Sequence, residues 1–90
     1  MRKIRMNVDG RVQGVGFRIT TKMLADQLGV YGSARNEDDG SVTIEAMGED
    51  EVIELFIQKV KESPTPVGRV SKFDLEEDAS ITERDSFVTN

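Results

Sequence analysis

Hydrophobic and polar residues alternate along several stretches of the chain, which is the pattern of strands with one buried face. Two longer stretches instead place apolar residues three and four positions apart, which is the spacing of one face of a helix. The predicted strands are residues 3–9, 30–35, 41–47 and 69–76, and residues 85–89 add a short fifth one. The predicted helices are residues 17–28, ended by Gly29, and residues 49–63, ended by the stretch from Pro64 to Pro66.

The apolar positions also predict the core, because each element presents them on one face. In the helices the inward positions are Phe17, Thr21, Leu24, Ala25 and Leu28, followed by Val52, Leu55, Phe56 and Val60. In the strands they are Ile4, Met6 and Val8, then Val42, Ile44 and Ala46, and finally Val70, Phe73 and Leu75. The alternation slips once in the last of these strands, which predicts a β-bulge there.

The order of elements is strand, helix, strand, strand, helix, strand. It predicts a ferredoxin-like α+β sandwich, with an antiparallel sheet of four to five strands and both helices on one face. In this topology the first two strands run parallel with the third between them, so their carboxyl ends lie at one sheet edge, about 9–10 Å apart. The loop after the first strand and Asn36 at the end of the second should therefore be neighbours. Ninety residues fit one domain, which we take as residues 1–90.

The chain contains neither cysteine nor histidine. It therefore has no thiolate nucleophile, no disulfide and no imidazole, the commonest general base near neutral pH and the commonest metal ligand. The acids Glu37, Asp38 and Asp39 precede Gly40 as in a solvated turn, so we expect no metal site and no cofactor. The N-terminus lacks the apolar core of a signal peptide, and no run of about 20 apolar residues occurs. We therefore expect a cytoplasmic protein that does not enter membranes.

The net charge of −5 is unevenly distributed along the sequence. Residues 1–36 hold seven cations and two acids, whereas residues 37–90 hold five cations and fifteen acids. An acidic protein is a poor general binder of nucleic acid, while a local excess of positive charge suits a small anion. RNA binding is further disfavoured because the first and third predicted strands carry no aromatic residue on which bases could stack.

Residues 10–18 combine three glycines with an arginine where the first helix begins. Glycine lets main-chain N–H groups converge, and a helix N-terminus adds unpaired N–H groups and partial positive charge. Arg18 adds a planar cation that suits phosphate or carboxylate, so the stretch predicts a site for a small tetrahedral anion. It is not a dinucleotide fingerprint, because Ile19 stands where the third glycine would be, and no Gly-Lys-Ser/Thr of a Walker loop follows.

Two separated motifs resemble those of the acylphosphatase family, and the resemblance covers nearly the whole chain. The first reads Gly10-Arg11-Val12-Gln13-Gly14-Val15-Gly16-Phe17-Arg18, and the second reads Arg35-Asn36 followed by Asp39-Gly40-Ser41-Val42. The resemblance implies that water hydrolyses small acyl phosphates to a carboxylate and inorganic phosphate, with no metal and no covalent intermediate. It further implies that Asn36 positions the attacking water and that Arg18 is catalytic. The phosphate-binding residues that it implies are Gln13, Gly14, Val15, Gly16, Phe17 and Arg18.

Two residues depart from the family pattern, because Ser33 stands where an aromatic is common and Glu37 stands where threonine is common. A carboxylate at position 37 would weaken substrate binding or shift its pH dependence. It also leaves open an alternative function, a non-catalytic module that binds phosphate or another anion and regulates a partner. A related alternative is a detached copy of the acylphosphatase-like domain of larger carbamoyl-transferring proteins. For the enzyme we expect a monomer whose partners are small acyl phosphates and the product phosphate.

Overall fold

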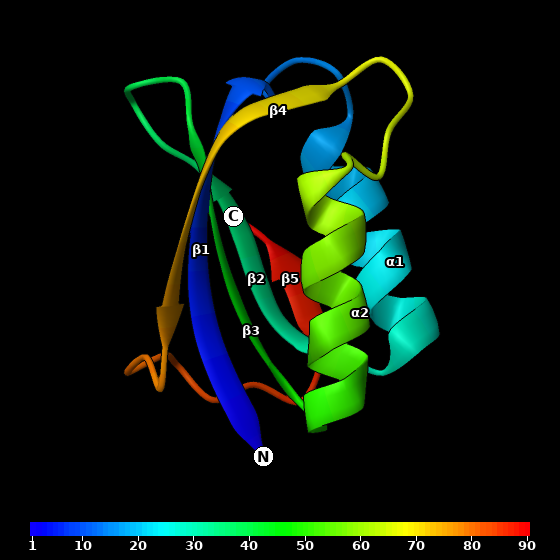
Figure 1. Ribbon diagram of the computed structural model, residues 1–90, viewed down its shortest axis with the longest axis vertical. Coiled ribbons are helices and arrows are strands. Elements are labelled where there is room, and N and C mark those ends of the chain that lie inside the picture. The colour runs from blue at the N-terminus through cyan, green and yellow to red at the C-terminus, as the bar shows by residue number, and fades with distance from the viewer.

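A sheet with two helices packed against one of its faces makes up the computed structural model, which describes residues 1–90 (Figure 1). The helices are α1 (Phe17–Leu28) and α2 (Asp50–Lys61). The strands are β1 (Arg2–Arg11), β2 (Tyr31–Asn36), β3 (Val42–Gly48), β4 (Arg69–Glu77) and β5 (Phe87–Thr89). They form one five-stranded sheet in the order β4-β1-β3-β2-β5, which confirms the ferredoxin-like sandwich.

The third strand lies between the first two, as predicted. Because β3 is antiparallel to both β1 and β2, those two strands are parallel to each other and end at the same edge of the sheet. Figure 1 shows that edge at the top of the view, where the β1–α1 connection and the β2–β3 turn both lie. The topology therefore brings together two segments that are far apart in the sequence.

The prediction that the whole sheet is antiparallel was wrong for its last strand. β5 pairs parallel with β2, from Gly32 opposite Phe87 to Ala34 opposite Thr89. β4 ends near the N-terminus of β1, and residues 78–86 cross that end of the sheet before β5 begins (Figure 1). A strand that starts there beside β2 has to run in the same direction as β2, so the sheet is mixed.

The helix α1 begins and ends where the apolar spacing predicts. Gly29 follows its last residue in the left-handed conformation, with φ of 76°, and donates its N–H to Ala25 O. The inward face of α2, in contrast, is rotated from the prediction. Leu55 is 44% exposed and Val52 is only partly buried, while the buried positions are Ile53, Phe56, Ile57 and Val60.

The edge strand β4 contains the predicted β-bulge. Asp9 faces Lys72 and Gly10 faces Val70, so the intervening Ser71 has no opposite residue on β1. Leu75 lies opposite the buried Met6 on the inner face of the sheet, as predicted, but it belongs to the edge strand and is still 40% exposed. Neither helix has the length and hydrophobicity that a membrane crossing requires.

The face of the sheet opposite the helices is covered by charged side chains. Arg5 on β1 forms ion pairs with Glu45 on β3 and Glu76 on β4, and its guanidinium also donates to Ser80 O. Lys3 pairs with Glu83. Long paired side chains of this kind shield a sheet face from water, although each exposed pair contributes little to stability.

The close contact between Gly32 on β2 and β3 provides a test of the register. Its φ is 151°, and a Cβ at this position would lie 1.9 Å from Glu45 O. We expect Gly32→Ala to lower the free energy of unfolding by more than about 2 kcal/mol, because the main chain has to move. Urea unfolding followed by far-UV circular dichroism measures this loss.

The matched control is Gly48→Ala on β3, where a Cβ would make ordinary contact with Ile53 at 3.5 Å. Its free energy of unfolding should stay within about 1 kcal/mol of the wild type. Equal unfolding midpoints for the two variants would contradict the β2–β3 register.

Candidate active site

The β1–α1 loop, residues 12–16, forms a tight bend with its main-chain N–H groups on the inside. Gly14 and Gly16 have φ of 75° and 78°, in the left-handed region that other residues avoid. A Cβ at either glycine would meet no atom within 4 Å, so it is the conformation, and not space, that requires glycine here. Left-handed residues alternating with ordinary ones turn successive N–H groups to the same side, which forms an anion-binding nest.

The N–H groups of this loop and of the first turn of α1 are free to bind a ligand. The first main-chain hydrogen bond of the helix runs from Thr20 N to Gly16 O. The main-chain N–H groups of residues 14–19 donate no hydrogen bond within the chain. The first turn of α1 also contains no acidic residue that would compete for these donors. The unpaired N–H groups and the positive end of the helix dipole therefore face the loop together.

The loop is fixed to the rest of the molecule on both sides. Val12 and Phe17, at its two ends, are each 1% exposed and belong to the hydrophobic core. Val15 O accepts a hydrogen bond of 3.3 Å from Thr65 Oγ1 in the α2–β4 connection, and Thr20 Oγ1 donates to Gly16 O at 2.8 Å. The N–H groups are consequently held in place before any ligand binds.

A small pocket of about 130 Å³ opens at this loop. It brings Asn36 of β2 together with Gly14, Gly16, Phe17 and Arg18 of the first motif, and its remaining lining residues are Val12 and Ile19. Two of the predicted phosphate-binding residues, Gln13 and Val15, do not line it. The side chain of Gln13 instead donates to main-chain oxygens of the β2–β3 turn.

Arg18 lines the pocket, and no aspartate or glutamate side chain pairs with its guanidinium. It takes part in none of the seven ion pairs of the chain. Its Nη1 donates to the main-chain oxygen of Asn90, and Asn90 N in turn donates to Ala34 O on β2 at 2.9 Å. Asn90 carries no signal in the sequence, because its contact with Arg18 depends on the parallel pairing of β5 with β2.

Asn36 presents a hydrogen-bond acceptor that the chain does not satisfy. Its Oδ1 is buried and has no partner, a condition it shares only with Thr21 Oγ1 and Arg84 Nε. Of these three residues, only Asn36 lines the pocket. An unpaired buried acceptor costs about 1–3 kcal/mol, so this atom favours a hydrogen-bond donor beside it.

The carboxylate of Glu37 is directed away from the pocket, although it follows Asn36 directly in the sequence. It accepts hydrogen bonds from Thr43 Oγ1 at 2.5 Å and from Arg35 Nη2 at 3.1 Å, both on the charged face of the sheet. These bonds, with Thr43 contributing most, lower the pKa of Glu37 below its ordinary value. The carboxylate is therefore held ionised where it does not line the anion pocket.

The acids of the β2–β3 turn, residues 37–41, are used within the turn. Asp39 Oδ1 accepts from Ser41 N at 2.9 Å and from Ser41 Oγ at 2.6 Å. No three side chains of histidine, cysteine, aspartate or glutamate lie close enough together to hold a metal ion. The turn thus serves to shape the main chain after Asn36.

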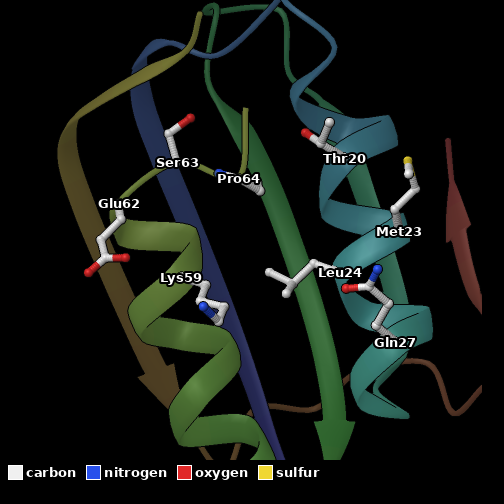
Figure 2. A pocket seen from close by; sticks show the side chains of 8 residues that line it. All are labelled: Thr20, Met23, Leu24, Gln27, Lys59, Glu62, Ser63 and Pro64. Carbon is white, nitrogen blue, oxygen red and sulfur yellow. The ribbon is translucent and has the colours of Figure 1, made fainter. Parts of the chain in front are cut away.

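A larger hollow of about 360 Å³ lies between the two helices, away from both motifs (Figure 2). Its lining residues are Thr20, Met23, Leu24 and Gln27 from α1, Lys59 from α2, and Glu62, Ser63 and Pro64 just after α2. It contains a single cation together with a carboxylate, and no set of main-chain N–H groups converges there. The smaller pocket at the β1–α1 loop is therefore the better anion site.

Comparison with known proteins gives the same family along the whole chain. The acylphosphatase family model matches residues 4–89. This chain belongs to the acylphosphatase family. An acylphosphatase from Enterococcus faecalis is 60% identical over 87 residues, which cover 97% of this chain and 96% of that protein. An acylphosphatase from Oceanobacillus iheyensis is 47% identical, with the same coverage of each chain.

Solved structures of acylphosphatases share the fold of this chain. The acylphosphatase from Bacillus subtilis superposes with a TM-score of 0.93 at 37% identity and covers 100% of this chain and 99% of its own. The acylphosphatase from Coxiella burnetii gives 0.89 at 30% identity, with 98% and 90% coverage. Full-length HypF in a phosphate- and nucleotide-bound form gives 0.88 at 29% identity, but this chain spans only 12% of it.

The carboxylate of Glu37 provides a test of how the β2–β3 turn is held. We expect Glu37→Gln to lower the free energy of unfolding at pH 7 by up to about 1 kcal/mol, because this partly exposed site loses charge-assisted hydrogen bonds. The pKa of Glu37 is lowered on folding, so its contribution is complete above 4.5 and is lost as the pH falls through the folded-state pKa. The urea midpoints at pH 7 and pH 3 measure the difference.

Asp38→Asn is the control, since this neighbouring acid makes no hydrogen bond in the structure and its substitution should leave both midpoints nearly unchanged. A Glu37→Gln deficit that persists in full at pH 3 would show that ionisation of this carboxyl is unimportant for the turn.

Proposed function

We propose that this protein hydrolyses the carboxyl–phosphate bond of small acyl phosphates through direct attack by water at phosphorus. Acylphosphatase is the activity of the family to which the chain belongs. The observation that carries the proposed mechanism is the pocket in which the free N–H groups of the loop, the Arg18 guanidinium and the unpaired Asn36 Oδ1 meet. These three elements match the three needs of the reaction: binding, charge stabilisation and a positioned water.

The phosphoryl group is bound by main-chain donors and one cation. The N–H groups of residues 14–18 surround its oxygens, and Arg18 balances the negative charge that these oxygens carry. Because the donors are fixed by Val12, Phe17 and Thr65 before binding, they need no rearrangement in the transition state. Such preorganised donors are usually the largest electrostatic contribution to catalysis.

Asn36 positions the attacking water. Its Oδ1 accepts a hydrogen bond from the water, and its amide N–H donates to a phosphoryl oxygen, which aligns the water with the bond that breaks. The P–O bond breaks with its electron pair on the departing carboxylate, which is stable without protonation. The proton of the water passes to a phosphate oxygen, so no general base, metal ion or covalent intermediate is needed.

We further propose that the enzyme works as a cytoplasmic monomer, without a nucleic-acid or membrane partner. The acidic net charge and the ion pairs that cover the open face of the sheet support this proposal. The pocket contacts only the phosphoryl end of a substrate, so discrimination among acyl groups should be weak. The outward position of the Glu37 carboxylate favours catalysis over the alternative of a non-catalytic anion-binding module.

Replacement of Asn36 separates catalysis from binding. We expect Asn36→Ala to lower kcat for benzoyl phosphate about 10²- to 10³-fold, because one preorganised polar group is lost, while KM changes little. The assay contains EDTA, and inorganic phosphate should inhibit the wild type and the variant competitively with similar Ki. Gln27→Ala, which removes an amide from the hollow between the helices, should leave kcat unchanged.

Full activity of Asn36→Ala would exclude its role in positioning water. Phosphate binding by a wild type that has no turnover would make the pocket a binding module, and activity lost in EDTA would argue for a metal-dependent reaction.

Arg18 should contribute to both steps. We expect Arg18→Ala to lower kcat about 10²- to 10³-fold and to raise KM about 10- to 100-fold, because the guanidinium bonds to the phosphoryl group before and during the reaction. Lys22→Ala is the matched control. Lys22 lies one turn further along α1 and, like Arg18, donates to a main-chain oxygen of the last four residues, that of Phe87, but it does not line the pocket. Steady-state kinetics that show similar defects in both variants would contradict this role of Arg18.

A further inference from the structure

The side chain of Gln13 connects the two halves of the pocket. Its Nε2 donates to Glu37 O at 2.8 Å and to Ser41 O at 2.9 Å. Gln13 belongs to the β1–α1 loop that supplies the free N–H groups, whereas the two acceptors belong to the β2–β3 turn that begins directly after Asn36. These are the only hydrogen bonds between residues 12–16 and residues 36–41.

The two acceptors close the neck of the β2–β3 turn. Glu37 N donates to Ser41 O at 2.8 Å, so the oxygens that Gln13 binds are those where the chain leaves and re-enters the sheet. The amide of Gln13 has two N–H groups, and each of the two is matched by one acceptor. Its remaining polar atom, Oε1, can only accept a hydrogen bond, so it is unsuited to bind a phosphate oxygen, which is an acceptor too. The side chain is therefore a connection between segments, and only the main-chain N–H of Gln13 is left for a ligand.

The turn that Gln13 binds is rigid in itself. Asn7 Nδ2 on β1 donates to Ser41 Oγ at 3.0 Å and to Thr43 Oγ1 at 3.2 Å. Asp39 binds both the N–H and the hydroxyl of Ser41. A turn held in this way moves as one body with the residue before it, Asn36. The position of Gln13 consequently sets the position of the Asn36 amide relative to the N–H groups of the loop.

We infer that Gln13 is a positioning residue, which fixes the Asn36 amide at the distance and angle from the bound phosphoryl group that the attack of water requires. This inference rests on the proposed function of the pocket. Misplacement of a reacting group by about 1 Å can lower a rate about 100-fold, so two hydrogen bonds outside the pocket are sufficient to control kcat.

The test is Gln13→Met, which keeps the length of the side chain and removes both N–H donors. With benzoyl phosphate, kcat should fall at least about tenfold, while Ki for inorganic phosphate stays within about twofold of the wild type. In an Asn36→Ala background the same substitution should cause no further loss, because the group that it misplaces is already absent. Gln58→Met on the exposed surface of α2 is the control for the substitution itself.

A structural role alone would give a different result. An unchanged kcat, an equal loss in both backgrounds, or a rise in Ki that matches the fall in kcat would each overturn the inference. Assays are made at a temperature well below the unfolding transition of every variant, so that a loss of stability does not reduce the amount of folded enzyme.

A second measurement does not depend on turnover. In wild type the NMR signals of the Asn36 side-chain amide should shift when inorganic phosphate is added, and in Gln13→Met this shift should be reduced although phosphate still binds. A wild type without turnover would reject the proposed function, and a smaller shift in Gln13→Met would then still show that Gln13 sets the position of the Asn36 amide beside bound phosphate. Turnover in wild type together with identical shifts in the two proteins would reject the inference alone.

Discussion

The left-handed conformation at Gly14 and Gly16 is the constraint on which the pocket depends. It turns several N–H groups toward one point, where they repel one another and form no bond within the chain. An isolated loop would not keep that shape, since water would bind each group separately. The fold keeps it by burying Val12 and Phe17 on either side in the hydrophobic core. The affinity of the loop for an anion is thus a consequence of core packing, and its free donors are the part of the structure that packing leaves unsatisfied.

The sheet topology supplies the second half of the pocket. A strand–helix–strand crossover brings β2 back parallel to β1, and β3 separates the two strands by one position. This separation leaves a gap at the sheet edge that the loop and the Arg18 side chain occupy together with Asn36. The parallel fifth strand then carries Asn90 to the same edge, where its main-chain oxygen binds the Arg18 guanidinium. Residues 14–18, Asn36 and Asn90, which are far apart in the sequence, therefore lie together at one edge of the sheet.

The sequence was sufficient to predict features that depend on local spacing or on a motif. The bounds of α1, the bulge opposite Gly10 and the meeting of the loop with Asn36 follow from periodicity, glycine placement and crossover geometry. The features that were mispredicted or missed depend on tertiary contacts. Leu55 has the same hydrophobicity as a core residue, and only the seating of α2 on the sheet shows that it faces solvent. Likewise, nothing in the sequence pairs Gln13 with Ser41 O, because main-chain acceptors carry no sequence signal.

Glu37 shows how a local hydrogen-bond network decides whether a charged neighbour enters a pocket. By position alone, a carboxylate directly after Asn36 is unfavourable for an anion site. Thr43 and Arg35 offer this carboxylate a hydroxyl and a guanidinium on the opposite face of the sheet, and these bonds also lower its pKa. Because its main-chain oxygen is at the same time held by Gln13, Glu37 contributes to the shape of the turn without adding negative charge to the pocket. At position 37 the pocket therefore depends on the main-chain oxygen, which accepts the hydrogen bond from Gln13. The side chain at this position is free to differ as long as neighbours on β2 and β3 hold it outside the pocket.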